Sequence, residues 1–290
     1  MARFIPAQPR ALEMQYFRDI DSIHTGMVQA VRQNIGLADA LPRLRMDADP
    51  GEWSFVNAVV TTITAGKDRV ISLLDTKFEQ VSHFNWVQWA REVKAGTGHQ
   101  LQEIRPWYEP GIDIQGRIWV RDNVSLITQM SGQMDAEFQR VVHDAVRRGL
   151  SKNQLKKDIL DQIEGFGGVR GLSAEQRADL IATDQILKAN SSLTNQRQQN
   201  AGVSYYRWQG MMDNRERHSH VLLQNHIFRV DGKPMTDADL KAVGNEWQTI
   251  RHPSESDSEA SRPGTAVRCR CHSETVFKGS VFDFEGLDEE

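Results

Sequence analysis

The residues best able to do chemistry are concentrated in the last third of the chain. Both cysteines stand two positions apart there, and an arginine- and histidine-rich run lies well upstream of them. Thiols, imidazoles and carboxylates are costly to keep near a core unless they bind a ligand or one another. We therefore expect these groups to meet in one compact module. Its members are Trp208, Asp213, Arg215, Arg217, His220, His252, Pro253, Cys269, Arg270 and Cys271.

The two cysteines have two interpretations. On an extended strand, residues two apart point to the same face, so the sulfurs of Cys269 and Cys271 would share one side. Two thiolates there could take two corners of a tetrahedral zinc site, with His220 and His252 as candidates for the others. Alternatively, both cysteines are small buried hydrophobic side chains on a core-facing strand. Zinc is the one cofactor that the sequence leaves open.

The run around Asp213 also has two interpretations. In an active site, Asp213 and His220 would form a catalytic acid–base pair on a phosphate-bearing substrate, as in a nuclease or transferase. In a structural network, Asp213 would accept hydrogen bonds from Arg215 or Arg217 and hold the loop against the cysteine strand. The sequence contains no serine-hydrolase, zinc-protease or Walker signature. Any enzymatic activity would therefore depend on this loop alone.

The overall composition indicates a folded chain without a membrane partner. Hydrophobic residues make up 39% of the 290 positions, which allows a substantial core and argues against global disorder. No apolar run approaches the length that crosses a bilayer, and the N-terminus lacks the apolar stretch of a signal peptide. We therefore expect synthesis and use in a reducing cytoplasm.

The middle of the chain is the basic part. Residues 140–232 carry 14 Lys and Arg against 10 Asp and Glu, an excess of four (14 − 10), although the whole chain has a net charge of −4. Such an excess is compatible with contact to nucleic-acid phosphates or with an ordinary solvated helix surface. A non-specific DNA-binding protein is therefore one of the functions that the sequence leaves open.

Hydrophobic periodicity predicts a helical chain with a β-rich end. Apolar residues three and four apart predict helices over 11–35, 52–80, 82–95 and 123–150, with a break at Gly66 and Ser82 as an N-cap. Capping boxes at 151–154 and 173–176 predict two more helices. Turn residues and aromatics in 96–122 favour an extended connector, whose aromatic side chains are core or an exposed docking patch.

After Gly202 the apolar period changes to two. Strands are expected from Val203, over 226–230 and over 267–277, and Thr236 is expected to cap a short helix. The predicted fold class is α+β, with a predominantly helical N-terminal two-thirds and a small β-rich C-terminal module.

In combination, these motifs resemble the phage Mu F-like minor head protein family of tailed bacteriophages and prophages. The resemblance covers about residues 123–277. It rests on the helix 178–185, Gly202-Val203 before the aromatic strand, the Asp213-x-Arg215-x-Arg217-x-x-His220 run, His252-Pro253, Pro263-Gly264 and Cys269-Arg270-Cys271.

The resemblance implies a virion component made in the host cytoplasm and located in the capsid interior near the portal. Its implied roles are head assembly, DNA packaging or DNA delivery. Its implied partners are the portal protein, a major capsid or scaffold protein, and packaged DNA, with no membrane. The resemblance implies a head morphogenesis domain that is helical over 123–200 and β-rich over 201–280. Residues 1–122 carry no assigned motif and are expected to be a helical portal- or capsid-docking part with its connector, and residues 281–290 are an acidic tail.

Overall fold

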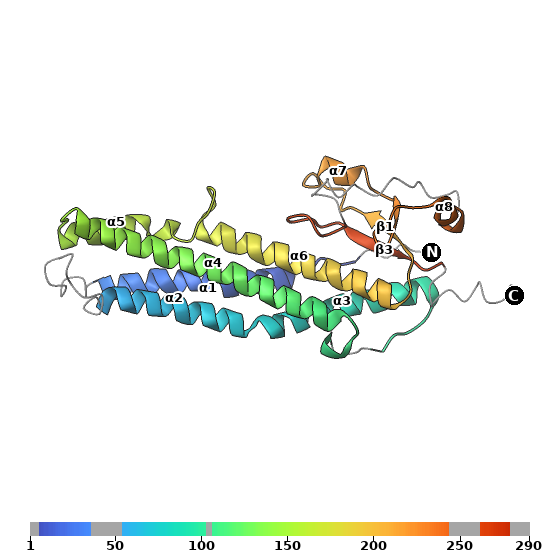
Figure 1. Cartoon of the computed structure of the whole chain (residues 1–290), viewed down its shortest axis with the longest axis horizontal. Helices are drawn as coiled ribbons and strands as arrows, with labels where there is room; N and C mark the ends of the chain where they lie inside the picture. Colours follow the sequence, from blue (N-terminus) through green and yellow to red (C-terminus); the bar gives the residue numbers. More distant parts are fainter. Residues whose placement is uncertain (1–5, 36–53, 103–105, 244–261, 279–290) are drawn as a thin grey trace. The chain divides into compact units, whose positions relative to one another are not determined.

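The structure, a computed structural model, describes residues 6–35, 54–102, 106–243 and 262–278. Helices dominate these residues and one small antiparallel sheet lies near their C-terminal end, which confirms the α+β class (Figure 1). No helix among the described residues is both long and apolar enough to cross a membrane. The chain divides into two compact units: residues 1–12, 76–119 and 184–290 form unit 1, and residues 13–75 and 120–183 form unit 2, as far as they are described.

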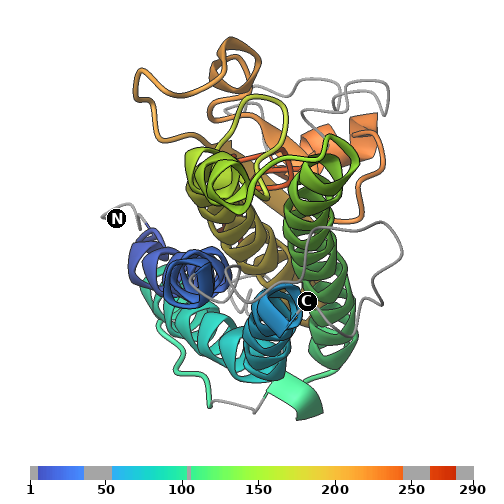
Figure 2. The same cartoon turned by 90° about the vertical axis from the view of Figure 1, so that its left-hand side faces the viewer.

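Unit 2 is a bundle of helices that run side by side (Figures 1 and 2). Its core is built from apolar residues at helical spacing, as in the stripe Ile20, Ile23, Met27 and Val31 of α1, all of them buried. The rings of Phe55 and Phe138 meet edge to face with centroids 5.6 Å apart. The helices that contribute to this unit are α1 (Arg10–Asn34), α2 (Ser54–Ser72), α4 (Ile112–Arg147), α5 (Lys152–Gln162), the short η4 (Ile163–Gly165) and the start of α6 (Ala174–Asn200).

The helix predicted over 52–80 is broken at a different place. Gly66 lies inside α2, where a Cβ would come 3.5 Å from the Cα of Ile23 in α1. A Cβ there would make only ordinary van der Waals contact, and the glycine does not end the helix. The break falls at Leu73, and α3 (Leu74–Thr97) follows at once. Ser82 consequently lies within α3 and is not an N-cap.

The expectation of an extended connector over 96–122 is wrong from Ile112 onward. A short 3-10 turn, η3 (Pro106–Tyr108), leads into α4, which begins at Ile112. The residues that reveal the helix are Ile112 and Trp119, which are seven positions apart and both buried. Exposed isoleucines on another face, Ile114 and Ile118, obscured this period. The predicted domain boundary after residue 122 falls within α4.

Both predicted capping boxes are present. The Ser151 hydroxyl accepts a hydrogen bond from the Gln154 backbone N–H at 3.3 Å, and the Gln154 side chain accepts from the Ser151 N–H at 3.0 Å. Ser173 and Gln176 make the same reciprocal pair at 3.2 and 2.9 Å. These caps fix the starts of α5 and α6, because each satisfies backbone donors that the first helical turn leaves unpaired.

Unit 1 contains the sheet, whose strand order is β2-β1-β3 with both pairs antiparallel. The strands are β1 (Tyr205–Gln209), β2 (Ile227–Arg229) and β3 (His272–Val276), accompanied by the short helices α7 (His218–Val221) and α8 (Asp237–Val243). The predicted cap of α8 is confirmed, since the Thr236 hydroxyl accepts from the Asp239 N–H at 3.2 Å.

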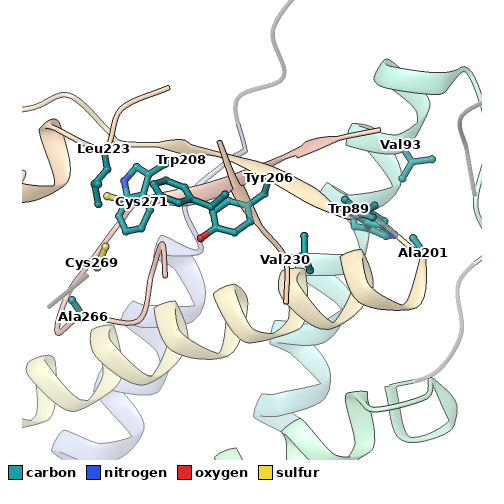
Figure 3. Close-up of a cluster of buried hydrophobic side chains, with 12 residues drawn as sticks. Trp89, Val93, Ala201, Tyr206, Trp208, Leu223, Val230, Ala266, Cys269 and Cys271 are labelled. Atoms are coloured by element: carbon teal, nitrogen blue, oxygen red, sulfur yellow. The ribbon is translucent and has the colours of Figure 1, made fainter. Parts of the chain in front are cut away.

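The sheet shares one hydrophobic core with residues of α3 and with the chain that follows α6 (Figure 3). Trp208 of β1 is fully buried in this core. Two polar contacts fix the sheet: the Gln198 amide of α6 donates to the Thr275 hydroxyl at 3.0 Å, and the Thr275 N–H donates to Glu92 of α3 at 2.6 Å. The core comprises Trp89, Val93, Ala201, Val203, Tyr206, Trp208, Leu223, Phe228, Val230, Ala266, Cys269 and Cys271.

Candidate functional site

Three buried side chains from two distant segments converge beside β1. Nδ1 of His220 lies 3.4 Å from Sγ of Cys269 and 3.4 Å from Sγ of Cys271. The three ligand-type atoms all lie within 4.8 Å of one another, and all three residues are buried. We call this set the thiol–imidazole cluster. Its formation confirms the expectation that the His220 loop and the paired sulfurs meet in one module.

The sulfurs share a side as predicted, but the predicted strand is too long. Over the expected range 267–277, only His272–Val276 forms a strand, β3. The preceding residues make turns, and Arg268 adopts a left-handed backbone with φ of 54°. Val267, expected on the same face as the cysteines, is half exposed. The cysteines thus follow a turn and precede β3, and their sulfurs lie on one side of the chain.

The turn before Cys269 is held against α6. Gly264 has φ of 82°, and a Cβ at this position would lie 2.6 Å from Cβ of Ser191, so only glycine fits without strain. The Ser191 hydroxyl donates to the Pro263 carbonyl. The Gly264 N–H then donates to Sγ of Cys269 at 3.3 Å. The turn therefore both positions this sulfur and stabilises negative charge on it.

The imidazole is fixed by the sheet and by α7. His220 is 1% exposed, and its ring meets the ring of Trp208 edge to face, with centroids 5.4 Å apart and planes at 79°. Trp208 lies in β1, the central strand of the sheet. Its backbone N–H donates to the carbonyl of His226, and its backbone carbonyl accepts from the N–H of Asn225. Rigid support of this kind reduces the number of orientations that the imidazole can take.

The Asp213 carboxylate is paired with an arginine that the sequence analysis had not assigned to it. The Arg270 guanidinium donates to both Asp213 oxygens at 2.6 Å, and the Arg215 N–H donates to one of them at 3.0 Å. The hydrogen bonds from Arg270 hold the pKa of Asp213 well below its usual range. Nη2 of Arg217 donates to the Val267 carbonyl at 2.7 Å. These contacts tie the Asp213 loop to the turn that carries the cysteines.

This geometry bears on the suggested acid–base pair. The oxygens of Asp213 face Arg270, and Nδ1 of His220 faces the two sulfurs. Asp213 could take up or release a proton only after its ion pair with Arg270 had opened. Catalysis by Asp213 and His220 stays a prediction. His252 and Pro253 lie outside the described residues, so their roles also stay predictions.

The two thiols are electrostatically unequal. The hydrogen bond from Cys271 is the largest influence on the pKa of Cys269, and together with His220 it lowers this pKa against the opposing effect of burial. The hydrogen bond to Cys269, followed by burial and by the charges of Cys269 and Glu216, raises the pKa of Cys271. The negative charge is thus favoured on Cys269 rather than on Cys271, and the thiolate is the form of cysteine that binds metals.

Glu216 is a member of the site that sequence reasoning missed. Its Oε1 lies 3.4 Å from Sγ of Cys271, and its Oε2 accepts from the Met212 N–H at 2.5 Å. A Cβ on Gly210 would lie 1.9 Å from Oε1, so Glu216 occupies space that only a glycine leaves open. In the sequence, a glutamate between two arginines resembles an ordinary surface ion-pair residue. Its approach to Cys271 is a tertiary contact without a local signal.

Comparison with known proteins finds a family match over the residues that carry this site. The family described as "Phage Mu protein F like protein" matches residues 136–274, a range that contains all three residues of the thiol–imidazole cluster. The chain is also 34% identical over 125 residues to an uncharacterized protein of Haemophilus influenzae. That alignment covers 43% of this chain and only 26% of the relative. No solved structure matches the chain. The family match over residues 136–274 therefore supports a phage Mu F-like head morphogenesis protein.

Proposed function

We propose that this protein is a minor head protein that binds the portal inside the capsid and acts in head assembly, DNA packaging or DNA delivery. The observation that carries the proposal is the family match over 136–274. A virion protein also fits the described helices, none of which could cross a membrane. A protein with this role needs a surface for the portal, and that surface should be apolar at its centre.

Unit 1 offers such a surface at η3 and the first turns of α4. Tyr108 is 78% exposed, Ile114 56% and Ile118 39%. Ile114 and Ile118 are four residues apart on one helix and therefore lie on the same face. Trp119, from the same aromatic stretch, is instead buried, and its indole N–H donates to the Gln185 carbonyl at 2.9 Å. The stretch thus supplies both core and exposed apolar side chains, and the exposed ones are our candidate portal contact.

The double change Ile114→Asp with Ile118→Asp is expected to weaken co-purification with the portal protein by at least about tenfold. Burying two isoleucine side chains contributes a few kcal/mol, and about 1.4 kcal/mol corresponds to tenfold in affinity. Leu160→Asp is the matched control, because Leu160 is 44% exposed but lies on α5. Equal recovery of portal with both variants would contradict this choice of surface. Failure of the wild-type chain to capture portal would contradict the proposed function.

Phe55, which the sequence places on an apolar stripe, is unsuitable for such a test. It is fully buried and packs on Phe138. An aspartate there would disrupt the core of unit 2 and would report on folding rather than on docking.

A second candidate function, contact with packaged DNA, is favoured by the arginines beside the cluster. Arg215, Arg217, Arg268 and Arg270 line one pocket together with Glu216. Arg270 pairs with Asp213 at 2.6 Å, and Arg215 contacts the same carboxylate at 3.4 Å but has a side chain that is 74% exposed. Arginines so placed suit phosphate oxygens, which are recognised without reading the base sequence.

If DNA binds here, Arg215→Gln is expected to reduce the slope of log affinity against log salt concentration by about one, because each neutralised phosphate contributes about 0.9. Arg121→Gln is the matched control: Arg121 is 75% exposed and pairs with the adjacent Asp122, much as Arg215 pairs with Asp213. Gel shifts over a salt series give the slopes. Identical slopes for both variants and the wild-type chain would exclude this surface as the DNA contact.

A further inference from the structure

We propose that the thiol–imidazole cluster is a structural zinc site, with Cys269, Cys271 and His220 as three ligands and the carboxylate of Glu216 as the fourth. This assignment does not depend on the proposed function, because it concerns the stability of the module and not its partners. It selects one of the two interpretations of the cysteines and replaces His252 with Glu216 as the fourth ligand.

The distances are those of a tetrahedral site. With Zn–S of about 2.3 Å and Zn–N of about 2.0 Å, sulfur and nitrogen ligands of one zinc lie about 3.6 Å apart. The two sulfurs lie 3.4 Å from Nδ1 of His220. Oε1 of Glu216 lies 3.4 Å from Sγ of Cys271 but outside the group of three atoms that lie within 4.8 Å of one another, so the carboxylate would have to move further toward that group to bind the same ion.

Hydrogen bonds account for part of the cluster, since the Cys271 thiol can donate to Glu216 and the Gly264 N–H donates to Cys269, but they leave the position of His220 unexplained. A ring nitrogen offers either one lone pair or one hydrogen, so it satisfies one partner well. Here two buried sulfurs share Nδ1 of His220 at equal distance. A cation located between the two sulfurs and Nδ1 of His220 would bind all three atoms at once. The donor set of two thiolates, one imidazole and one carboxylate selects zinc over the harder magnesium and calcium ions.

The surroundings resemble the outer shell of a metal site. The Gly264 N–H donates to Sγ of Cys269, and the Met212 N–H holds the carboxylate of Glu216. Such contacts orient ligands and stabilise their anionic forms. His220 is separated from the cysteines by 49 and 51 residues, so one ion would close a long loop. Closing a long loop restricts the unfolded chain, which is how a structural zinc here would stabilise the module.

The first test uses the wild-type full-length chain, purified without chelator and without a histidine tag. Elemental analysis is expected to find about one zinc per chain. After removal of the zinc, titration with cobalt(II) is expected to give thiolate-to-cobalt charge-transfer absorption and the visible bands of a tetrahedral ion. A chain that carries no zinc and gives neither absorption would overturn the proposal, as would a full complement of another metal.

Variants then identify the ligands. Cys271→Ser is expected to reduce bound zinc at least about tenfold under dialysis against a weak chelator, while His218→Ala, an exposed histidine of the same short helix, should keep it. Glu216→Gln is expected to weaken zinc binding and His252→Ala to leave it unchanged. Zinc binding that is unchanged in Glu216→Gln and weakened in His252→Ala would show that Glu216 is not the fourth ligand. Zinc retained by Cys271→Ser would overturn the assignment altogether, and the cobalt spectrum of the wild-type chain does not depend on whether the variants fold.

Discussion

Arg197→Met is expected to lower the free energy of unfolding by about 3 kcal/mol, because it would leave the Glu109 carboxylate, which is only 12% exposed, without its partner. Arg197 lies in α6 and its side chain is 2% exposed. Its guanidinium donates to Glu109 at 2.8 Å, to the Asn85 side chain at 2.6 Å and to the Ser82 hydroxyl at 3.0 Å. One guanidinium thus joins α3, the segment before α4, and α6 within unit 1.

Urea unfolding followed by circular dichroism would measure this loss. Arg147→Met is the matched control, since Arg147 pairs with Asp144 at 2.6 Å but is 74% exposed, and exposed pairs contribute at most about 1 kcal/mol. The double variant Arg197→Met with Glu109→Gln should recover part of the loss by removing the unpaired charge. A loss for Arg197→Met no larger than that of the control would show that the buried network contributes little to stability.

The second large effect concerns pH. Burial raises the pKa of Glu92 from the usual 4.5 to about 7, opposed by hydrogen bonds from Thr275 and assisted by the charge of Glu274. The folded state therefore binds this proton more tightly than the unfolded chain does. As pH rises from about 4.5 to about 7 the folded state loses stability relative to the unfolded state, and above about 7 the loss is complete. A shift of this size corresponds to a loss on the order of 3 kcal/mol.

Glu92→Gln should abolish this part of the pH dependence. Glutamine keeps an oxygen that can accept from the Thr275 N–H but carries no charge, so the variant should be more stable than the wild type at pH 8 and similar to it at pH 4. Glu79→Gln, a change in an exposed residue of the same helix, controls for the removal of a charge from α3. Parallel stability curves for the wild type and Glu92→Gln would contradict the buried, neutral carboxyl.

Features of the fold that depend on local sequence were predictable. The caps at Ser151 and Ser173 form as expected, because a capping box is a contact between residues three apart. Helix α1 follows from its apolar period for the same reason. The connector over 96–122 was mistaken because Pro110-Gly111 suggests a turn between bodies, whereas Ile112 begins a new helix directly after that turn.

The site was predictable only in part. Two cysteines at i and i+2 point to a shared face, and that local rule placed Cys269 and Cys271 together. The partners Arg270 for Asp213 and Glu216 for Cys271 depend on how two loops meet, which no local pattern encodes. The same holds for Arg197 and Glu92, whose burial is hidden because each lies in a polar stretch of its helix.

The proposal that this chain is a component of a phage head is tested most directly by quantitative mass spectrometry of purified procapsids and mature virions. We expect the chain in these particles, in a few copies whose number follows that of the portal protein rather than that of the major capsid protein. Absence of the chain from both particles, in lysates where it is abundantly produced, would contradict the account.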